Sequence, residues 1–237
     1  MKTPGFNFRP VDQAIAERVI VDSVPERAAE LREIWAKYDL QFAVVSDSLK
    51  IGFRSRGKVI EFDNKTMRIL WVLAHSAWRM FVCYSPHVLL ALATGCSIDL
   101  EMMQRDQGLE KARASFEGLL YVVRNAVAAQ SADDVAWPLD LPDPMADRSS
   151  LSAEQKAVFD LAIMATAYGF LHEVQHVMFA KDKNAPPRRP DEEIACDVFA
   201  RDFLLAKIDS YAKTTSWSAD LILMKRAMAI ALGAFFV

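Results

Sequence analysis

The chain has 237 residues, which is long enough to bury a sizeable core in one domain or in two small ones. Hydrophobic residues make up 52% of it and charged residues 25%, and this composition excludes disordered, collagen-like and low-complexity proteins. A net charge of −3 gives no basis for a nucleic-acid partner, and three cysteines without a CxxC spacing indicate a reducing compartment rather than a disulfide framework.

The first forty residues are expected to be helical and not to form a signal peptide. Pro4, Gly5 and several polar residues interrupt the apolar run that a signal peptide requires, so we expect a cytoplasmic protein. Ser23 and Glu26 have the spacing of a capping box, and the apolar residues that follow recur on one helical face. The spacing therefore predicts a helix that opens at Ser23.

Residues 40–62 are the stretch of the chain that is richest in strand-forming residues. Three β-branched or aromatic runs, at residues 40–45, 49–53 and 58–62, are separated by turn residues. They predict a small antiparallel sheet. Because the remaining segments show helical spacing, the predicted fold class is α+β and mostly α-helical.

Asn64 is predicted to cap a helix through Tyr84, and residues 107–130 have the spacing of another helix. Residues 80–98 carry no formal charge and have about the minimum length of a membrane span. Pro86 and several polar residues interrupt this stretch, which favours a boundary between two buried helices. We therefore expect no membrane partner, and a membrane-embedded protein is the minority interpretation.

Two polar, proline-containing segments at residues 131–150 and 181–190 predict loops. Between them, Ser152 is expected to begin a long helix, and a further helix is expected to start near Asp191. The apolar C-terminal run from residue 221 predicts a packed terminal helix. We expect an N-terminal region with the sheet at residues 1–135 and a helical region at residues 136–237, within one integrated domain.

The long helix contains the sequence LHEVQH at residues 171–176. The four-residue spacing places His172 and His176 one turn apart on the same face, where both can bind one metal ion. Glu173 lies beside them, in position to act as a general base on a water held by the metal. The chain has only four histidines, so chance poorly explains two in this turn. We predict one Zn²⁺ per chain as the cofactor.

A hydrolytic zinc site needs a third protein ligand and an open position for water. Glu193 and Asp197 are four residues apart on one face of the next helix, so we predict Glu193 as that ligand. Asp197 is then placed to accept a hydrogen bond from a ligand histidine. Glu192 is the alternative ligand if the helix register differs. Cys196 lies off this face and is predicted to be a small buried residue.

The motif at residues 172–176, followed by Glu193 and by Asp197-Val-Phe-Ala200, resembles the pattern of the Lit family of phage-exclusion peptidases. It is more distantly similar to the ImmA/IrrE metallopeptidases, and both families are gluzincin-like. The resemblance covers roughly residues 137–205.

This resemblance implies a zincin-like core with His172, His176 and Glu193 as zinc ligands and Glu173 as the general base. It also implies an intracellular endopeptidase that cleaves a specific protein substrate, which for Lit-type enzymes belongs to the translation machinery. Such an enzyme stays quiet until an activating partner or trigger is present. Two alternatives are an ImmA-like protease that cleaves a repressor and a catalytically silent, zinc-stabilised binding module.

The sequence does not identify the second group that would stabilise an oxyanion. The candidates are Tyr168, Tyr211, His75 and His87. His75 is otherwise expected to be a core residue satisfied by hydrogen bonding. The arginines at positions 188 and 189 are expected to lie in a solvated loop, with contact to an acidic substrate as the alternative. A strand from the predicted sheet is expected to border the cleft and to pair with an extended substrate.

Overall fold

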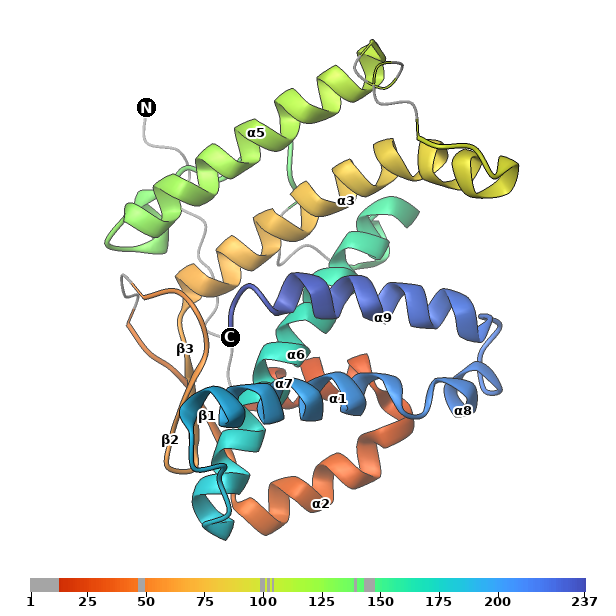
Figure 1. Ribbon diagram of the computed structural model, residues 1–237. Helices are drawn as coiled ribbons and strands as arrows, with labels where there is room; N and C mark the ends of the chain where they lie inside the picture. Colours follow the sequence, from red (N-terminus) through yellow and green to blue (C-terminus); the bar gives the residue numbers. More distant parts are fainter. Residues whose placement is uncertain are drawn as a thin grey trace.

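The structure of the protein, a computed structural model, describes residues 13–46, 50–98, 101, 103, 105–138, 140–142 and 148–237. It is mostly helical, with one small mixed sheet (Figure 1). The helices are α1 (Gln13–Ser23), α2 (Ala28–Tyr38), α3 (Asn64–Thr94), α5 (Gln107–Ala128), α6 (Ala153–Asp182), α7 (Arg189–Leu205), α8 (Ile208–Ala212) and α9 (Ala219–Gly233). The strands are β1 (Gln41–Val44), β2 (Arg54–Arg56) and β3 (Val59–Phe62). The α+β, mostly helical prediction is confirmed.

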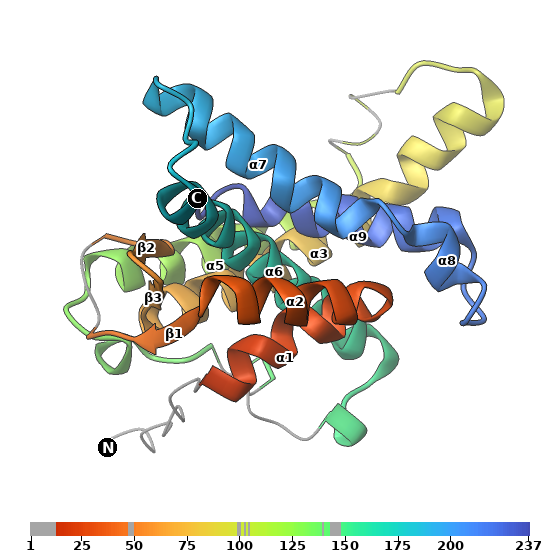
Figure 2. The same ribbon diagram turned by 90° about the horizontal axis from the view of Figure 1, so that it is seen from below.

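Helix α6 lies at the centre of the fold, as Figures 1 and 2 show. It begins at the predicted position, where Ser152 Oγ accepts a hydrogen bond from the Gln155 amide and the Gln155 side chain accepts one from the Ser152 amide. Helices α1, α3, α7 and α9 all contact it. Its residues are therefore buried on most sides, and the buried stretch includes His172 and Glu173.

The same helix has the length and composition of a membrane span. However, 78% of its most apolar window is buried inside the protein, and the core helix of a soluble protein has the same character. Among the described residues, α6 alone is both long enough and apolar enough to span a membrane, and the uncharged stretch at residues 80–98 is not.

The sheet is mixed, so the prediction of an antiparallel sheet is wrong for one of its two strand pairs. β3 is the central strand, and it pairs with β1 in parallel and with β2 in antiparallel orientation. After β1 the chain crosses to the far edge of the sheet, and it returns through the β2–β3 hairpin. β2 is consequently an edge strand.

The strand predicted at residues 49–53 is not formed; residue 49 lies outside the described residues, and β2 begins only at Arg54. Gly52 has a φ of 134°, a positive value that residues with a side chain rarely adopt and that does not occur in a regular strand. Its amide donates a hydrogen bond of 3.1 Å to Thr66 Oγ1. The Phe53 amide donates to the Phe236 carbonyl at 3.4 Å. These hydrogen bonds tie the segment to α3 and to the C-terminal residues instead of to a neighbouring strand.

Helix α3 starts where expected but does not stop at Pro86. Its N-cap is Asp63, one residue before the predicted Asn64, and Asp63 accepts a hydrogen bond from the Thr66 amide at 2.7 Å. The helix continues through Pro86 to Thr94. Pro86 is exposed, so the carbonyl that loses its N–H partner can be hydrated. The predicted boundary between two buried helices is therefore wrong, and the end of α3 projects from the body (Figure 2).

The predicted capping box at Ser23 is also wrong. Ser23 is the last residue of α1, and its hydroxyl donates to the Val19 carbonyl at 2.7 Å. A short 3₁₀ helix (Pro25–Arg27) follows before α2 begins. Glu26 does not cap this turn because its carboxylate accepts hydrogen bonds from the buried guanidinium of Arg226 on α9.

Helices α5, α7 and α9 agree with the predictions, whereas α8 was not predicted. α5 and α9 form as expected, and α7 starts two residues before Asp191. The loop at residues 131–150 contains two short 3₁₀ helices (Ala132–Asp134 and Arg148–Ser150), while residues 139 and 143–147 lie outside the described residues. One buried core includes residues from both sides of position 135, and the division into two regions there stays a prediction.

Candidate metal centre

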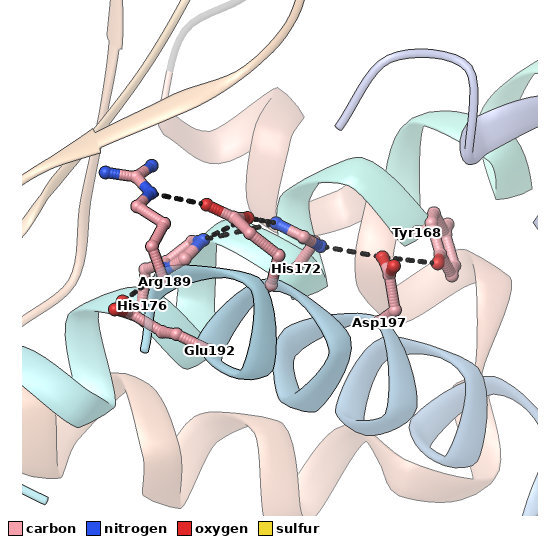
Figure 3. A network of polar contacts seen from close by, with 7 residues as sticks. Tyr168, His172, His176, Arg189, Glu192 and Asp197 are labelled. Carbon is pink, nitrogen blue, oxygen red and sulfur yellow. Dashed lines mark hydrogen bonds and ion pairs between the residues drawn. The ribbon is translucent and has the colours of Figure 1, made fainter. Parts of the chain in front are cut away.

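Three side chains from α6 and α7 bring one donor atom each to a common point. His172 Nε2 and His176 Nε2 lie 3.2 Å apart. Glu193 Oε2 lies 3.2 Å from the first of these nitrogens and 3.1 Å from the second. The two histidines are held together by the turn of α6, and the packing of α7 against α6 supplies the glutamate (Figure 3).

This triangle of atoms fits a tetrahedral divalent cation. Bonds of about 2.0–2.1 Å from zinc to nitrogen and oxygen ligands place neighbouring ligand atoms about 3.3 Å apart. The three observed separations of 3.1–3.2 Å are close to that value. Two imidazoles and a carboxylate are also the donor types that zinc prefers.

The far side of His172 is held by Asp197 of α7. Asp197 Oδ1 lies 2.9 Å from His172 Nδ1, and the Tyr168 hydroxyl donates a hydrogen bond of 2.8 Å to the same oxygen. Burial and the hydrogen bond to Asp197 raise the pKa of Tyr168, so its hydroxyl remains protonated and a donor. Tyr168 therefore supports the histidine from behind, instead of lying free to bind an oxyanion.

The other two side chains of the triangle are also held from behind, as Figure 3 shows. Glu192 Oε1 lies 2.7 Å from His176 Nδ1, on the opposite side of the ring from the triangle. Arg189 Nε donates a hydrogen bond of 2.8 Å to Glu193 Oε1, which leaves Oε2 directed at the imidazoles. Burial pushes the pKa of Glu193 up, but Arg189 and His176 outweigh it and keep this pKa below its usual value.

The sequence did not predict that Glu192 would contact His176 or that Arg189 would contact Glu193. Glu192 is the predicted alternative ligand. In the structure, however, Glu193 contacts the Nε2 atoms of both histidines, whereas Glu192 contacts only Nδ1 of His176. Arg189 was expected in a solvated loop and is instead the first residue of α7. Its position four residues before Glu193 on one helix was the available signal. Arg188 pairs only with Asp191 among the described residues.

Glu173 lies next to the histidines and faces the sheet. Burial raises the pKa of Glu173, an effect that the two imidazoles and hydrogen bonds from the hydroxyl and backbone amide of Ser55 only partly offset. Ser55 is the middle residue of edge strand β2, and β2 contacts α6. The sheet therefore borders the candidate centre. Ser55 was missed because no local pattern links it to a helix more than a hundred residues later.

Cys196 lies close to the centre, although its position on the helix is off the face that carries Glu193 and Asp197. It is fully buried, as predicted, but its Sγ and a ring nitrogen of each of His172 and His176 all lie within 4.8 Å of one another. These three residues could hold a metal ion. Burial, and then the surrounding carboxylates led by Glu193, raise the pKa of the Cys196 thiol.

The three other oxyanion candidates contact residues elsewhere in the described part of the chain. Tyr211 lies under the guanidinium of Arg226, and His87 pairs with Asp106 at 3.4 Å. His75 is buried against Trp71, as expected for a core histidine. Its Nε2 has no hydrogen-bond partner among the described residues, so the expectation of a satisfied histidine is wrong.

Comparison with known proteins gives one family. The family described as Peptidase U49 matches residues 60–237, a range that begins within β3 and contains every side chain of the triangle. No curated protein matches the chain. No solved structure matches it either. Because the family match covers well over half of the sequence, the chain belongs to the Peptidase U49 family and is a peptidase.

Proposed function

We propose that this peptidase is a zinc-dependent endopeptidase with a zincin-like core, in which His172, His176 and Glu193 hold one zinc ion. The observation that carries the proposal is the convergence of their Nε2, Nε2 and Oε2 atoms at 3.1–3.2 Å. A zinc ion in such a site supplies an activated water and polarises the carbonyl group of the scissile bond.

Glu173 is the proposed general base. It takes a proton from the attacking water and then delivers it to the nitrogen of the leaving amine. Its burial suits this role because a raised carboxyl pKa makes Glu173 a better proton acceptor and still allows it to release the proton. The hydroxyl and the backbone amide of Ser55 act on this carboxylate and favour its charged form.

The partners of the ligands on α7 position them. Asp197 and Glu192 each lie against an Nδ1 atom, which keeps the Nε2 lone pairs directed at the triangle. Arg189 keeps one oxygen of Glu193 occupied, so that the other is free to bind metal. Such partners fix both the tautomer and the orientation of metal-binding side chains.

The edge of β2 is the proposed place for the substrate backbone. Among the described residues, β2 pairs with a strand on one side only, with β3, and the Ser55 amide acts on Glu173. An extended peptide that lies along this edge would pass next to the general base. The proximity of β2 to Glu173 supports the expectation that a strand of the sheet borders the cleft.

We further propose that the substrate is a specific intracellular protein and that the enzyme is cytoplasmic, without nucleic acid or membrane partners. The similarity of the HEVQH and downstream Glu193 and Asp197 motifs to Lit-type enzymes supports a phage-exclusion role, with a component of the translation machinery as substrate and an activating trigger. An ImmA-like cleavage of a repressor is the alternative.

Metal analysis combined with Glu173→Gln tests the zinc peptidase. The wild type should contain one zinc per chain and, once the activating trigger is supplied, cleave its substrate in a cell lysate, as followed by the appearance of new protein N-termini. Glu173→Gln should keep the zinc and lose about 10²–10⁴-fold in cleavage rate, because only the base is removed. Glu154→Gln is the matched control, since Glu154 lies exposed on the same helix.

The rival is a zinc-stabilised binding module without catalysis. It predicts that Glu173→Gln retains zinc and the full biological effect of the wild type. Less than about a tenth of a metal ion per chain after purification in the presence of zinc would contradict both the peptidase and the module, since each needs the metal.

A further inference from the structure

The candidate centre has one more potential ligand than a catalytic zinc site requires. Catalytic sites use three protein ligands and leave a position open, whereas sites with four protein ligands are closed. Besides the three side chains of the triangle, the buried thiol of Cys196 lies within 4.8 Å of a ring nitrogen of each histidine. Cys196 follows Glu193 by three residues on α7, so the two are surface neighbours on that helix.

The surroundings of this thiol suit a cation. The carboxylates of Glu173, Glu192, Glu193 and Asp197 all act electrostatically on Cys196. Thiolate is also among the preferred ligands of zinc. One carboxylate and one thiolate together balance the charge of a divalent ion, which matters in a site where Cys196 and His172 are almost fully buried.

We propose that Cys196 is a fourth protein ligand, and that the metal centre of the resting protein is therefore closed. This inference rests on the proposed zinc site. On coordination the S–H bond breaks, a bond from sulfur to the metal forms, and the proton leaves to solvent without any electron transfer. A tetrahedral site places sulfur and nitrogen ligand atoms about 3.5 Å apart. Sγ lies within 4.8 Å of a ring nitrogen of each histidine, so its approach to such a position is at most on the order of 1 Å.

A closed centre has no position for water or for a substrate carbonyl, so the resting protein is latent. Cleavage requires Cys196 to leave, which frees the fourth position. The thiol thus acts as a built-in competitor of the substrate.

X-ray absorption at the zinc edge of the purified full chain tests the proposal without an activity assay. The wild type should show one sulfur at about 2.3 Å beside nitrogen and oxygen ligands at about 2.0–2.1 Å. Cys196→Ser and Cys196→Ala should lose the sulfur and keep the zinc. Cys83→Ser, on α3 and away from the centre, should match the wild type.

The outcomes separate the two proposals. A zinc shell of nitrogen and oxygen alone in the wild type overturns the role of Cys196 and leaves the peptidase proposal intact. Absence of zinc overturns both. A sulfur shell together with cleavage by Cys196→Ser that is several-fold faster than wild type supports latency, whereas unchanged or slower cleavage by this variant contradicts it. Because the wild-type spectrum decides the ligand, failure of a variant to fold does not affect this test.

Discussion

At the scale of single residues, the candidate centre depends on side chains that contribute no atom to the triangle. Three residues of α7 each hold one member of the triangle from behind: Arg189, Glu192 and Asp197. Without these contacts the imidazoles and the carboxylate could rotate. The loss of conformational entropy on fixing them would then weaken the binding of a metal ion.

We expect Asp197→Asn and Glu192→Gln each to weaken zinc binding by about 10- to 100-fold, because each removes a charged partner from an Nδ1 atom. The zinc dissociation constant, measured by competition with a chelator, checks this. Asp202→Asn is the control, since Asp202 is exposed on the same helix and pairs with Arg201. Equal affinity of all three variants and the wild type would show that these contacts do not position the histidines.

His75 makes the stability of the protein depend on pH. Burial, followed by the nearby charge of Arg79, lowers the pKa of His75 from 6.5 to about 4. The unfolded chain takes up a proton near pH 6.5 and the folded chain does not, so stability falls as the pH drops from 6.5 to about 4.

Between pH 7 and pH 5 this single group should cost the wild type roughly 2 kcal/mol of unfolding free energy. His75→Gln, which does not titrate, should lack that part of the pH dependence. Urea unfolding of both proteins at the two pH values measures the difference. If their stabilities fall in parallel, His75 is already accessible to protons in the folded state.

At the scale of elements, the approach of the sheet to α6 depends on a glycine. Gly169 lies three residues before His172, and a Cβ atom there would collide with the ring of Phe53. Phe53 directly precedes β2 and also packs edge-on against Phe170, with ring centres 5.0 Å apart. The missing side chain therefore lets β2 come close enough for Ser55 to reach Glu173.

Gly169→Ala should destabilise the protein by about 1–3 kcal/mol because the added methyl overpacks a full core. Gly118→Ala should instead stabilise it by about 0.5–1 kcal/mol, since Gly118 lies within α5 with open space around it. Thermal or urea unfolding compares the two. A stabilising effect of Gly169→Ala would mean that Phe53 does not press on α6.

At the scale of the whole molecule, a buried ion pair joins the segment after α1 to the last helix, α9. Arg226 on α9 binds Glu26 through Nη1 and Nη2, and it also donates to the carbonyls of Ser23 and Leu204. Both side chains of the pair are less than a tenth exposed. The pair therefore ties the turn between α1 and α2 to α7 and α9.

Glu26→Gln should cost about 3–5 kcal/mol of unfolding free energy, because it leaves the buried Arg226 charge without a counter-charge. Glu101→Gln is the matched control. Glu101 pairs with Arg105 on the surface, where both side chains are more than four fifths exposed, so its loss should cost less than about 1 kcal/mol. Similar losses for the two variants in urea unfolding would contradict the role of the buried pair.

The sequence by itself predicted the features that depend on helical periodicity. The pairing of His172 with His176 follows from a turn of 3.6 residues, and so does the shared face of Glu193 and Asp197. The capping box of α6 and the start of α5 were found for the same reason, since local hydrogen bonds and spacing determine both. The peptidase class followed from these local patterns.

The tertiary structure alone decided which partners these side chains meet. That Glu192 lies against His176, that Ser55 binds Glu173 and that Cys196 lies near both histidines depends on how α7 and β2 pack on α6. The parallel pairing of β1 with β3 and the diversion of Glu26 to Arg226 arise in the same way. Contacts between segments far apart in the chain are selected by the fit of the whole core, and no periodicity within a single segment encodes that fit.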